Sequence, residues 1–410
     1  MVNNRKLPVG IQDFEKLRTG SFVYVDKTAY VYRLAYESAP CFLGRPRRFG
    51  KSLLLSTLKA YFLGKKELFE GLAIAGLEKE WVEYPVFHLD MNLESYTGLA
   101  SLESALDGNL RPLEAKWRRD PDDKSLSMRF TGLIRRACEQ TGKKVVVLID
   151  EYDKPLINTM EAPDVHDDIR KALKGFYGVL KSADTYLRFV MLTGVTKFSQ
   201  VSVFSDLNHL QDISLNKDYA GICGISESEL ISEFEPELHA LAEETENTYE
   251  ETLAEMKKRY DGYHFARNSE GMYNPFSVLN TFSSMEFRDY WFKTGTPTFL
   301  VNLLKREDFD IRNLKGDVTI DARSITDYRP ENNNPIPILY QSGYLTIKGY
   351  KKMFDAYVLG FPNGEVEYGF LHELLPAYAP RDMTGDFFVG NFIEDLMTGN
   401  VDAFMTRLRA

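Results

Sequence analysis

The stretch that decides the fold is Phe42-Leu43-Gly44-Arg45-Pro46-Arg47-Arg48-Phe49-Gly50-Lys51-Ser52. It predicts a short apolar strand over 41–43, then a loop, then a helix from Ser52 to Leu63. In such a loop the backbone amides and the helix N-terminus face an anion. Lys51 reaches the outer phosphates of a nucleoside triphosphate, and the Ser52 hydroxyl binds Mg²⁺. The stretch therefore predicts a phosphate-binding loop (Walker A), although Gly-Lys-Ser alone also fits a strand-to-helix turn with a solvated lysine.

The loop departs from the usual pattern at its first position. The pattern G-x-x-x-x-G-K-[ST] places a glycine at position 45, where this sequence has Arg45, and Gly44 comes one residue early. The arginines of the loop are expected to add charge-assisted contacts to the phosphates. Two roles stay open for Arg47 and Arg48, arginine fingers or ion pairs with acidic neighbours such as Glu151 and Asp153. The residues expected to contact the nucleotide from this loop are Arg45, Pro46, Arg47, Arg48, Phe49, Gly50, Lys51, Ser52 and Leu53.

A second motif follows about a hundred residues later. Lys144–Ile149 is a continuous apolar, β-branched run, typical of a strand buried on both faces, and it ends in Asp150-Glu151. This is the Walker B pattern. Asp150 is expected to hold Mg²⁺ through water, and Glu151 to orient and deprotonate the attacking water. A buried strand with two exposed carboxylates at its end is the alternative, but it does not predict a phosphate loop upstream with one further strand, Tyr84–Leu89, in between.

The next predicted strand, Leu187–Leu192, is followed by Thr193-Gly194-Val195-Thr196-Lys197. A polar residue in this place suits a sensor of the γ-phosphate, with Thr193 as the first candidate and Thr196 as the second. A strand capped by a hydroxyl is an equally open interpretation. The catalytic candidates are thus Glu151, Lys51, Thr193 and Arg48.

Strands and helices alternate along the first half of the chain, which predicts a parallel sheet covered by helices on both faces, an α/β fold. We expect an NTPase domain over 1–225 and a helical lid over 226–300, opened by the capping box Ser226-x-x-Glu229. A helix over Ile336–Gln341 and strands near 344–347 and 356–359 suggest a winged-helix-like domain over 301–380. Residues 381–410 are expected to be a helical segment, and the amphipathic pattern that begins near Asn391 still continues at Ala410, which suggests a chain cut short.

The composition excludes several classes of protein. The 410 residues carry a formal net charge of −10, so no overall positive field favours nucleic acid. Three distant cysteines and scattered histidines give neither a disulfide framework nor a zinc site. No apolar leader or membrane-length run occurs, so a cytoplasmic protein without a membrane partner is expected. Two short basic stretches remain candidates for nucleic acid, Lys348–Lys352 and 116–119, although a solvated helix end suits the latter better.

Several sequence blocks together resemble a bacterial family described as AAA-ATPase-like. They are 7–14 (Leu-Pro-Val-Gly-Ile-x-Asp-Phe), 24–28 (Tyr-Val-Asp-Lys-Thr), 45–52, 150–155 (Asp-Glu-Tyr-Asp-Lys-Pro), 193–199 (Thr-Gly-Val-Thr-Lys-Phe-Ser) and 260–263 (Tyr-Asp-Gly-Tyr). The resemblance covers almost the whole chain, and it implies that an arginine at position 45 is a family feature. It also implies an AAA-like fold and a C-terminal PD-(D/E)XK nuclease-superfamily domain. No copy of that nuclease signature occurs in these 410 residues. The resemblance further suggests a role with mobile elements or in defence.

These observations predict an ATPase or nucleotide-dependent switch that uses ATP and Mg²⁺ and regulates a linked nuclease. The lack of a guanine-specific motif favours ATP. Residues 10–14, Asp13 and Phe14 among them, are expected on the adenine side, with Asn274 or nearby tyrosines approaching the base. Two alternatives stay open, a degenerate, non-hydrolysing scaffold for protein or DNA and a nucleic-acid binder. Oligomerisation is left open as well.

Overall fold

The computed structural model describes residues 5–197, 210–291, 303–304, 314, 318–326, 334–370, 395 and 399–409. Its centre is a parallel sheet with the strand order β2-β3-β4-β1-β5. The strands are β1 (Cys41–Gly44), β2 (Val86–Asp90), β3 (Val145–Asp150), β4 (Leu187–Gly194) and β5 (Gln211–Asp212). The predicted α/β architecture is therefore confirmed. Every residue of β3 is buried, as its continuous apolar run predicted.

The strand order brings three loops together. β4 lies between β1 and β3, with Gly44 beside Gly194 and Ile149 beside Leu192. Because parallel strands end at the same edge of a sheet, the segments that follow β1, β3 and β4 meet there. β2, which lies between β1 and β3 in the sequence, is at the edge of the sheet in space.

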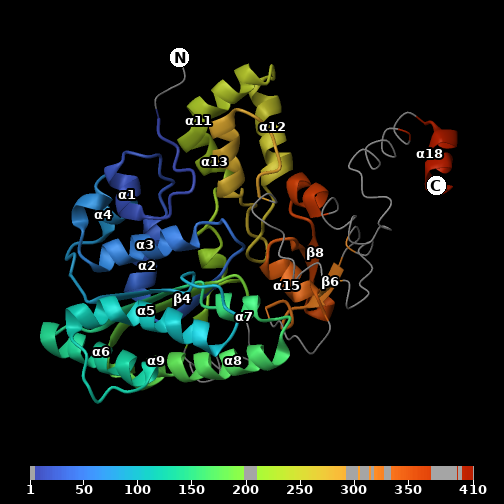
Figure 1. Cartoon of the computed structure of the whole chain (residues 1–410). Coiled ribbons are helices and arrows are strands. Elements are labelled where there is room, and N and C mark those ends of the chain that lie inside the picture. The colour runs from blue at the N-terminus through green and yellow to red at the C-terminus, as the bar shows by residue number, and fades with distance from the viewer. Residues whose placement is uncertain are drawn as a thin grey trace.

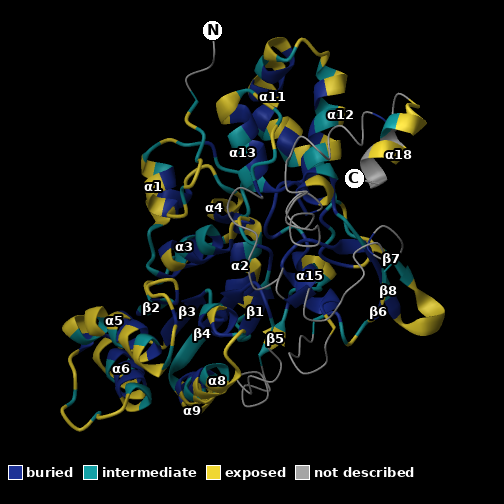
Figure 2. Ribbon diagram, turned by 45° about the vertical axis from the view of Figure 1, so that its right-hand side comes forward, coloured by how far each residue is buried: buried dark blue, intermediate teal, exposed yellow. Residues whose placement is uncertain are grey.

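Helices cover both faces of the sheet, as Figures 1 and 2 show. One side carries α1 (Phe14–Thr19), α2 (Thr28–Glu37), α3 (Lys51–Phe62) and α4 (Ala73–Leu77). The other carries α5 (Leu99–Trp117), α6 (Leu126–Thr141), α8 (Pro163–Tyr177) and α9 (Val179–Ser182). The short α7 (Lys154–Asn158) follows β3 closely. Helix α3 begins directly at the predicted phosphate loop, so the local prediction for this region is confirmed.

The segment after position 225 contains the helices α11 (Glu227–Glu244), α12 (Tyr249–Tyr260) and α13 (Pro275–Ser284). The lid expected over 226–300 stays a prediction. The capping box at the start of α11 is present, with the Ser226 hydroxyl accepting from the Glu229 N–H and the Glu229 carboxylate accepting from the Ser226 N–H. A second capping box, formed by Thr248 and Glu251, starts α12.

The C-terminal unit contains the helix and the hairpin that the sequence predicts. They are α15 (Ile336–Gln341), β7 (Thr346–Lys351) and β8 (Ala356–Gly360). A third strand, β6 (Val318–Asp321), was not predicted, and the antiparallel order is β6-β8-β7. Parts of 301–333 lie outside the described residues, and the winged-helix assignment stays a prediction. Of the helical segment expected over 381–410, the structure describes residues 395 and 399–409, which include the helix α18 (Val401–Arg409). Residues 381–394, 396–398 and 410 lie outside the described residues.

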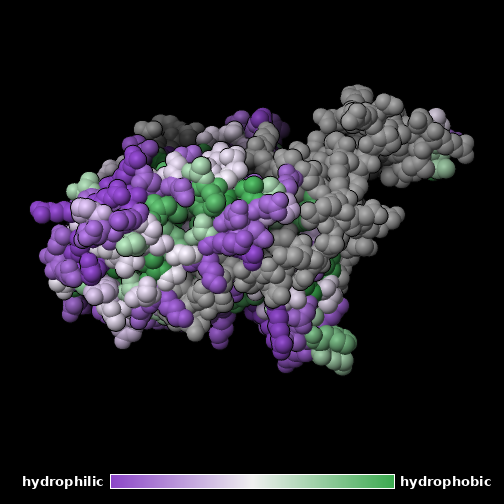
Figure 3. Space-filling model, turned by 60° about the horizontal axis from the view of Figure 1, so that its bottom comes forward, coloured by the Kyte–Doolittle hydropathy of each residue, from purple (hydrophilic) through white to green (hydrophobic). Residues whose placement is uncertain are grey.

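Figure 3 shows one face of the molecule, on which hydrophobic side chains form small groups among hydrophilic ones. Within the described ranges, no helix combines the length and the apolar character that spanning a bilayer requires.

Candidate functional site

The loop between β1 and α3 opens onto a cavity of about 370 Å³. Gly50 caps α3 with φ +93°, a conformation that favours glycine, and a Cβ placed there would meet no atom within 4 Å. The backbone amides at the start of α3 have no partner within the helix, so the helix start is suited to an anion. The described residues that line the cavity are Pro8, Gly10, Ile11, Gln12, Arg47, Arg48, Gly50, Lys51, Ser52, Leu53, Asn92, Glu151, Lys154, Pro275, Phe276 and Leu279.

Lys51 and Glu151 meet in this cavity. Lys51 is only 4% exposed, and its Nζ donates to the carbonyl oxygens of Arg45 at 3.1 Å and Pro46 at 3.2 Å. The same Nζ lies 3.5 Å from Oε1 of Glu151. Glu151 has φ +53°, which is uncommon for a residue other than glycine and marks local backbone strain at this point. Three of the four catalytic candidates, Lys51, Glu151 and Arg48, therefore line the cavity, and the first two are in contact.

Thr193 contacts Asp150 and does not line the cavity. Its Oγ1 donates to Oδ1 of Asp150 at 2.6 Å, and the same oxygen accepts the Glu151 N–H at 3.1 Å. Both Thr193 and Asp150 are buried. Thr196, the second sensor candidate, is fully buried, and its hydroxyl has no hydrogen-bond partner among the described residues. Thr193 therefore bonds to the Walker B carboxylate of Asp150 and does not itself reach the cavity.

Asp153 is a residue of the site that sequence reasoning named only as a neighbour. It is fully buried, and its Oδ2 accepts the backbone N–H groups of Val195 at 2.9 Å and Thr196 at 2.6 Å. Burial, and then the nearby Glu151 charge, raise the pKa of Asp153 to about 7. Asp153 thus ties the segment after β3 to the segment after β4. Its place three residues after Asp150 is the feature that could have indicated this role.

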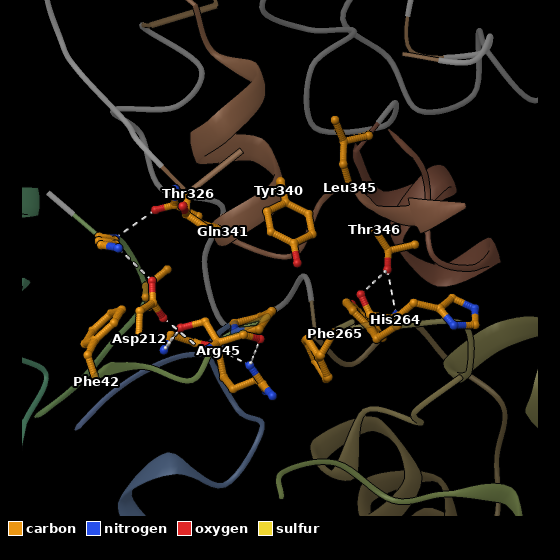
Figure 4. Close-up of a pocket in the computed structure, with 16 residues that line it drawn as sticks. Phe42, Arg45, Asp212, His264, Phe265, Thr326, Tyr340, Gln341, Leu345 and Thr346 are labelled. Atoms are coloured by element: carbon orange, nitrogen blue, oxygen red, sulfur yellow. Dashed lines mark hydrogen bonds and ion pairs between the residues drawn. The ribbon is translucent and has the colours of Figure 1, made fainter. Parts of the chain in front are cut away.

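The side chain of Arg45 points away from the cavity, so its predicted contact with phosphate is wrong. Arg45 is 1% exposed, and its guanidinium donates to the carbonyl oxygens of Gly44, Ser214 and Tyr219. It also lies 4.1 Å from the centre of the Phe265 ring, and Figure 4 shows the two side chains beside each other. Only the carbonyl of Arg45 faces the site, where it accepts from Lys51.

Two other loop residues also turn their side chains inward. Phe49 is buried against Tyr263, and Pro46 is buried beside Gly343, so neither lines the cavity as predicted. Arg47 and Arg48 do line it. Among the described residues neither forms an ion pair with Glu151 or Asp153. Instead, the Arg48 guanidinium lies 4.9 Å from the centre of the Phe276 ring.

The N-terminal segment reaches the cavity through Gly10, Ile11 and Gln12, and not through Asp13 and Phe14. Asp13 instead caps α1, with Oδ1 accepting the Lys16 N–H at 2.7 Å. Phe14 is fully buried and packs its ring against Phe69 at 4.9 Å. Asp13 and Phe14 therefore do not line the cavity, whereas Gly10, Ile11 and Gln12 do, and the contact of this segment with a nucleotide stays a prediction.

The helical unit closes the opposite side. Asn274 is fully buried as the cap of α13, and its Oδ1 accepts the N–H groups of Phe276 and Ser277, so its side chain is not available to a base. Pro275, Phe276 and Leu279 reach the cavity in its place. Sequence reasoning also missed Asn92 and Lys154, both of which follow the ends of predicted strands closely.

A smaller, mostly apolar cavity of about 100 Å³ adjoins the first one. The two share Pro8, Gly50, Leu53, Pro275 and Leu279. Its further lining comes from both halves of the chain and includes Val23, Tyr24, Val25, Ile225 and Phe234. The combined space therefore has a polar end at Lys51 and an apolar end between α3 and α13.

Comparison with known proteins identifies one family by its sequence pattern. A family described as predicted AAA-ATPase matches residues 8–204, which include the loop, β3 with Asp150-Glu151, and β4. Together with the parallel sheet flanked by helices, this match identifies the fold as the predicted α/β P-loop NTPase fold.

One relative matches over nearly the whole chain. It is an uncharacterised protein in the vnfD 5′ region of Azotobacter chroococcum mcd 1, 37% identical over 387 residues, which are 93% of this chain and 72% of that protein. Among solved structures, the ORC2 protein of Aeropyrum pernix (ADPNP–ADP complexes) aligns with a TM-score of 0.31 and 12% identity, over 91% of this chain and 97% of that one. This similarity is too low to indicate a shared fold or function.

Proposed function

This chain belongs to the family of predicted AAA-ATPases, and from that premise we propose that it binds ATP with Mg²⁺ in the cavity at the start of α3 and hydrolyses it. The observation that carries the proposal is the buried Lys51 ammonium at the end of an open phosphate loop, 3.5 Å from Glu151. Among the described residues, the partners of this buried cation are two carbonyls and one carboxylate, which it is placed to exchange for phosphate oxygens.

The residues at the cavity fit a nucleotide and its metal. The amides after Gly50 and the Lys51 ammonium would hold the phosphates, with Arg47 and Arg48 at the rim. The Ser52 hydroxyl would bind Mg²⁺ directly, and Asp150, held by Thr193, would bind it through water. Bound Mg²⁺ would neutralise charge on the phosphate oxygens. Asp150 is buried just behind Glu151, as a residue that acts through water can be.

Glu151 is proposed as the general base. When Lys51 transfers from the carboxylate to phosphate oxygens, Glu151 becomes free to orient a water molecule and to accept its proton. Thr193 would hold Asp150 in register between β3 and β4. Its role as a γ-phosphate sensor would then be indirect, through Asp150.

The apolar end of the cavity is proposed for the adenine ring. It is bounded by Pro8, Val25 and Leu53 on one side and by Ile225 and Leu279 on the other. Apolar walls favour an aromatic base, and this cavity shares lining residues such as Gly50 and Leu53 with the polar cavity at Lys51. The described residues of this end offer no carboxylate for a guanine amino group, which agrees with ATP as the nucleotide.

Two variants test the proposal with an ATP analogue and Mg²⁺. Lys51→Ala should weaken binding at least about 50-fold, as expected when charge-assisted contacts to phosphate are lost. Lys59→Ala, on the exposed face of α3, is the control and should bind like the parent. Glu151→Gln should bind normally but hydrolyse ATP about 10²–10⁴-fold more slowly. Unchanged turnover in Glu151→Gln would favour the non-hydrolysing scaffold.

Regulation of a linked PD-(D/E)XK nuclease domain is proposed on resemblance alone. DNA cleavage by a natural family member that carries both parts should then depend on ATP, and equal cleavage with and without ATP would contradict it.

A second candidate function, binding of duplex nucleic acid, is favoured by the tip of the β7–β8 hairpin. Met353 and Phe354 are 87% and 67% exposed and follow the exposed Lys351 and Lys352. Figure 2 shows this tip projecting from the molecule. Lysines beside exposed apolar side chains are the combination that some proteins use to enter a minor groove. Lys348 is less available, because its Nζ donates to the carbonyl of Pro362.

Fluorescence anisotropy with a duplex of about 20 base pairs tests this surface. Lys351→Glu with Lys352→Glu should abolish binding, and Met353→Ser with Phe354→Ser should weaken it about five- to tenfold. Tyr36→Ser, at another exposed aromatic residue, is the control. Absence of binding by the parent at low salt would reject this function. For the other basic stretch, 116–119, a solvated helix end stays the favoured interpretation: the Trp117 ring is buried, with the Lys116 ammonium 4.8 Å from its centre.

A further inference from the structure

The phosphate loop is held from its far side by the second half of the chain. Each residue from 45 to 49 contacts a residue beyond position 260. The pairs are Arg45 with Phe265 (4.1 Å to the ring centre), Pro46 with Gly343, the Arg47 carbonyl with the Trp291 indole (3.1 Å), Arg48 with Phe276 (4.9 Å to the ring centre) and Phe49 with Tyr263 (4.6 Å between ring centres).

The close approach at Pro46 requires a glycine on the other side. Gly343 has φ +90°, and a Cβ built on it would lie 2.7 Å from Cβ of Pro46. Any larger residue would therefore push the loop away from the C-terminal unit. Nearby, Oε1 of Gln341 accepts the Lys197 N–H at 2.8 Å, so the segment after β4 is held by the same unit.

The Arg47 contact belongs to a buried chain of hydrogen bonds. The Trp291 backbone N–H donates to Oε1 of Glu365 at 2.8 Å, and the Ser277 hydroxyl donates to Oε2 of Glu365 at 2.8 Å. Glu365 is 1% exposed and lies just after β8, while Ser277 lies in the first turns of α13, next to cavity-lining Phe276. One carboxylate thus connects α13, Trp291 and, through the indole, the backbone of the loop.

We propose that Trp291, held in place by Glu365, is a positioning residue for the phosphate loop, and that the contacts of residues 45–49 relay nucleotide occupancy to the unit that carries the β7–β8 hairpin. Where a standard phosphate loop has its first glycine, this loop has Arg45, and the Arg45 side chain is one of the contacts that attach the loop to the second half of the chain. The relay rests on the proposed nucleotide binding, whereas the positioning role does not.

Hydrogen exchange without nucleotide tests the positioning role. Trp291→Phe removes the indole N–H but keeps an aromatic ring beside Tyr344. Peptides that cover 44–54 should exchange about five- to tenfold faster in this variant, as expected for the loss of one hydrogen bond. Trp117→Phe, at the end of α5, should leave their exchange unchanged. Equal exchange in the parent and in Trp291→Phe would overturn the positioning role.

Two substitutions at Glu365 separate its role from general packing. Glu365→Gln can still accept from the Trp291 N–H and bond to Ser277, so loop exchange should stay within about twofold of the parent. Glu365→Ala leaves both donors without their acceptor and should accelerate exchange at 44–54 as Trp291→Phe does. Unchanged exchange in Glu365→Ala would contradict the role of Glu365.

Trp291 also reports the relay directly. The chain has three tryptophans, so Trp81→Phe with Trp117→Phe leaves Trp291 as the single emitter. Addition of AMP-PNP and Mg²⁺ should change its emission, and Lys51→Ala should abolish the change. Constant emission while calorimetry shows binding would overturn the relay. If calorimetry shows no binding by the parent, the proposed function fails, and the exchange experiment still decides the positioning role.

Discussion

Arg45 shows how one residue separates the sequence pattern from the chemistry of the loop. At a position where phosphate loops have glycine, an arginine suggests either an extra phosphate contact or a degenerate site. The structure does not support the extra contact, because the guanidinium is buried and donates to the carbonyls of Gly44, Ser214 and Tyr219. Burial lowers the pKa of Arg45, and the ring of Phe265 faces the cation.

Restoring the consensus glycine should therefore harm the protein. Arg45→Gly removes the guanidinium hydrogen bonds to the carbonyls of Gly44, Ser214 and Tyr219 and opens a space beside Phe265, so we expect a loss of about 3 kcal/mol in the free energy of unfolding, measured by urea denaturation. Nucleotide affinity should fall as well. An Arg45→Gly variant as stable as the parent, or one that binds ATP more tightly, would show that the arginine is a tolerated defect. Arg119→Gly, at an exposed position after α5, is a comparison for general loss of an arginine side chain.

For single residues, the sequence predicted which of them lie near the site better than it predicted the directions of their side chains. Lys51, Ser52 and Glu151 line the cavity as predicted, since a strand that ends in Asp-Glu and a Gly-Lys-Ser helix start fix these directions. Arg45, Phe49 and Phe14 are close in the sequence to residues that line the cavity, but their own side chains turn into the core. Their direction depends on Phe265, Tyr263 and Phe69, which are distant in the sequence and could not be placed from it.

Among the elements, the ends of β3 and β4 are joined most tightly. Asp150 binds Thr193, Asp153 binds the amides after Gly194, and the Tyr152 hydroxyl donates to the carbonyl of Thr196 at 2.8 Å. Gly194 makes this close approach feasible, because a Cβ there would lie 2.5 Å from Oδ1 of Asp153.

Gly194→Ala is accordingly expected to destabilise the fold by about 1–3 kcal/mol and to displace Asp153 and its neighbour Glu151. Thermal unfolding measures the first effect, and ATP turnover measures the second. Gly175→Ala in α8 is the matched control, because its Cβ would meet no atom within 4 Å. The control should be neutral or more stable by up to about 1 kcal/mol. A Gly194→Ala variant that behaves like Gly175→Ala would contradict the packing described for this edge of the sheet.

Glu365 gives the contact between α13 and the C-terminal unit a dependence on pH. Burial raises its pKa to about 7 from an ordinary value of 4.5. Between these values the folded chain keeps a proton that the unfolded chain has lost. Its contribution to the free energy of unfolding is therefore full below about pH 4.5 and is lost as the pH rises through about 7.

Glu365→Gln should remove this dependence. Its stability relative to the parent should rise between pH 5 and 8, by on the order of 2–3 kcal/mol, as chemical denaturation at several pH values can measure. The pKa of Asp153 is also raised to about 7. Asp153 therefore adds a similar pH dependence to the stability of both proteins, which appears in each curve but not in the difference between them. A difference between parent and variant that stays constant with pH would contradict a carboxyl group that protonates in this range.

Most elements of the first half were predictable because each is marked by local pattern. Strands β1 to β4 and helix α3 lie within a few residues of their predicted ranges. The sequence did not indicate β6, a short strand that depends on pairing with β8, nor the edge position of β2. Pairing partners are set by contacts between distant segments, which a pattern along one segment does not contain.

For the whole molecule, the central observation is that its two halves meet at the phosphate loop. The N-terminal half supplies the loop, Lys51 and Glu151, while α13 closes the cavity and Trp291, Tyr263 and Gly343 hold the loop from behind. Nucleotide binding would therefore affect residues in both halves of the chain. The apolar end of the cavity, with Leu53 from α3 and Leu279 from α13, is formed by the same arrangement.

Calorimetric titration of the full chain with AMP-PNP and Mg²⁺ tests the central claim most directly. We expect one site per chain with a dissociation constant of about 1–100 µM, at least about 50-fold weaker binding by Lys51→Ala, and parent-like binding by Lys59→Ala. Absence of heat from the parent at about 1 mM nucleotide, or equal binding by Lys51→Ala, would contradict the assignment of this cavity as a nucleotide site.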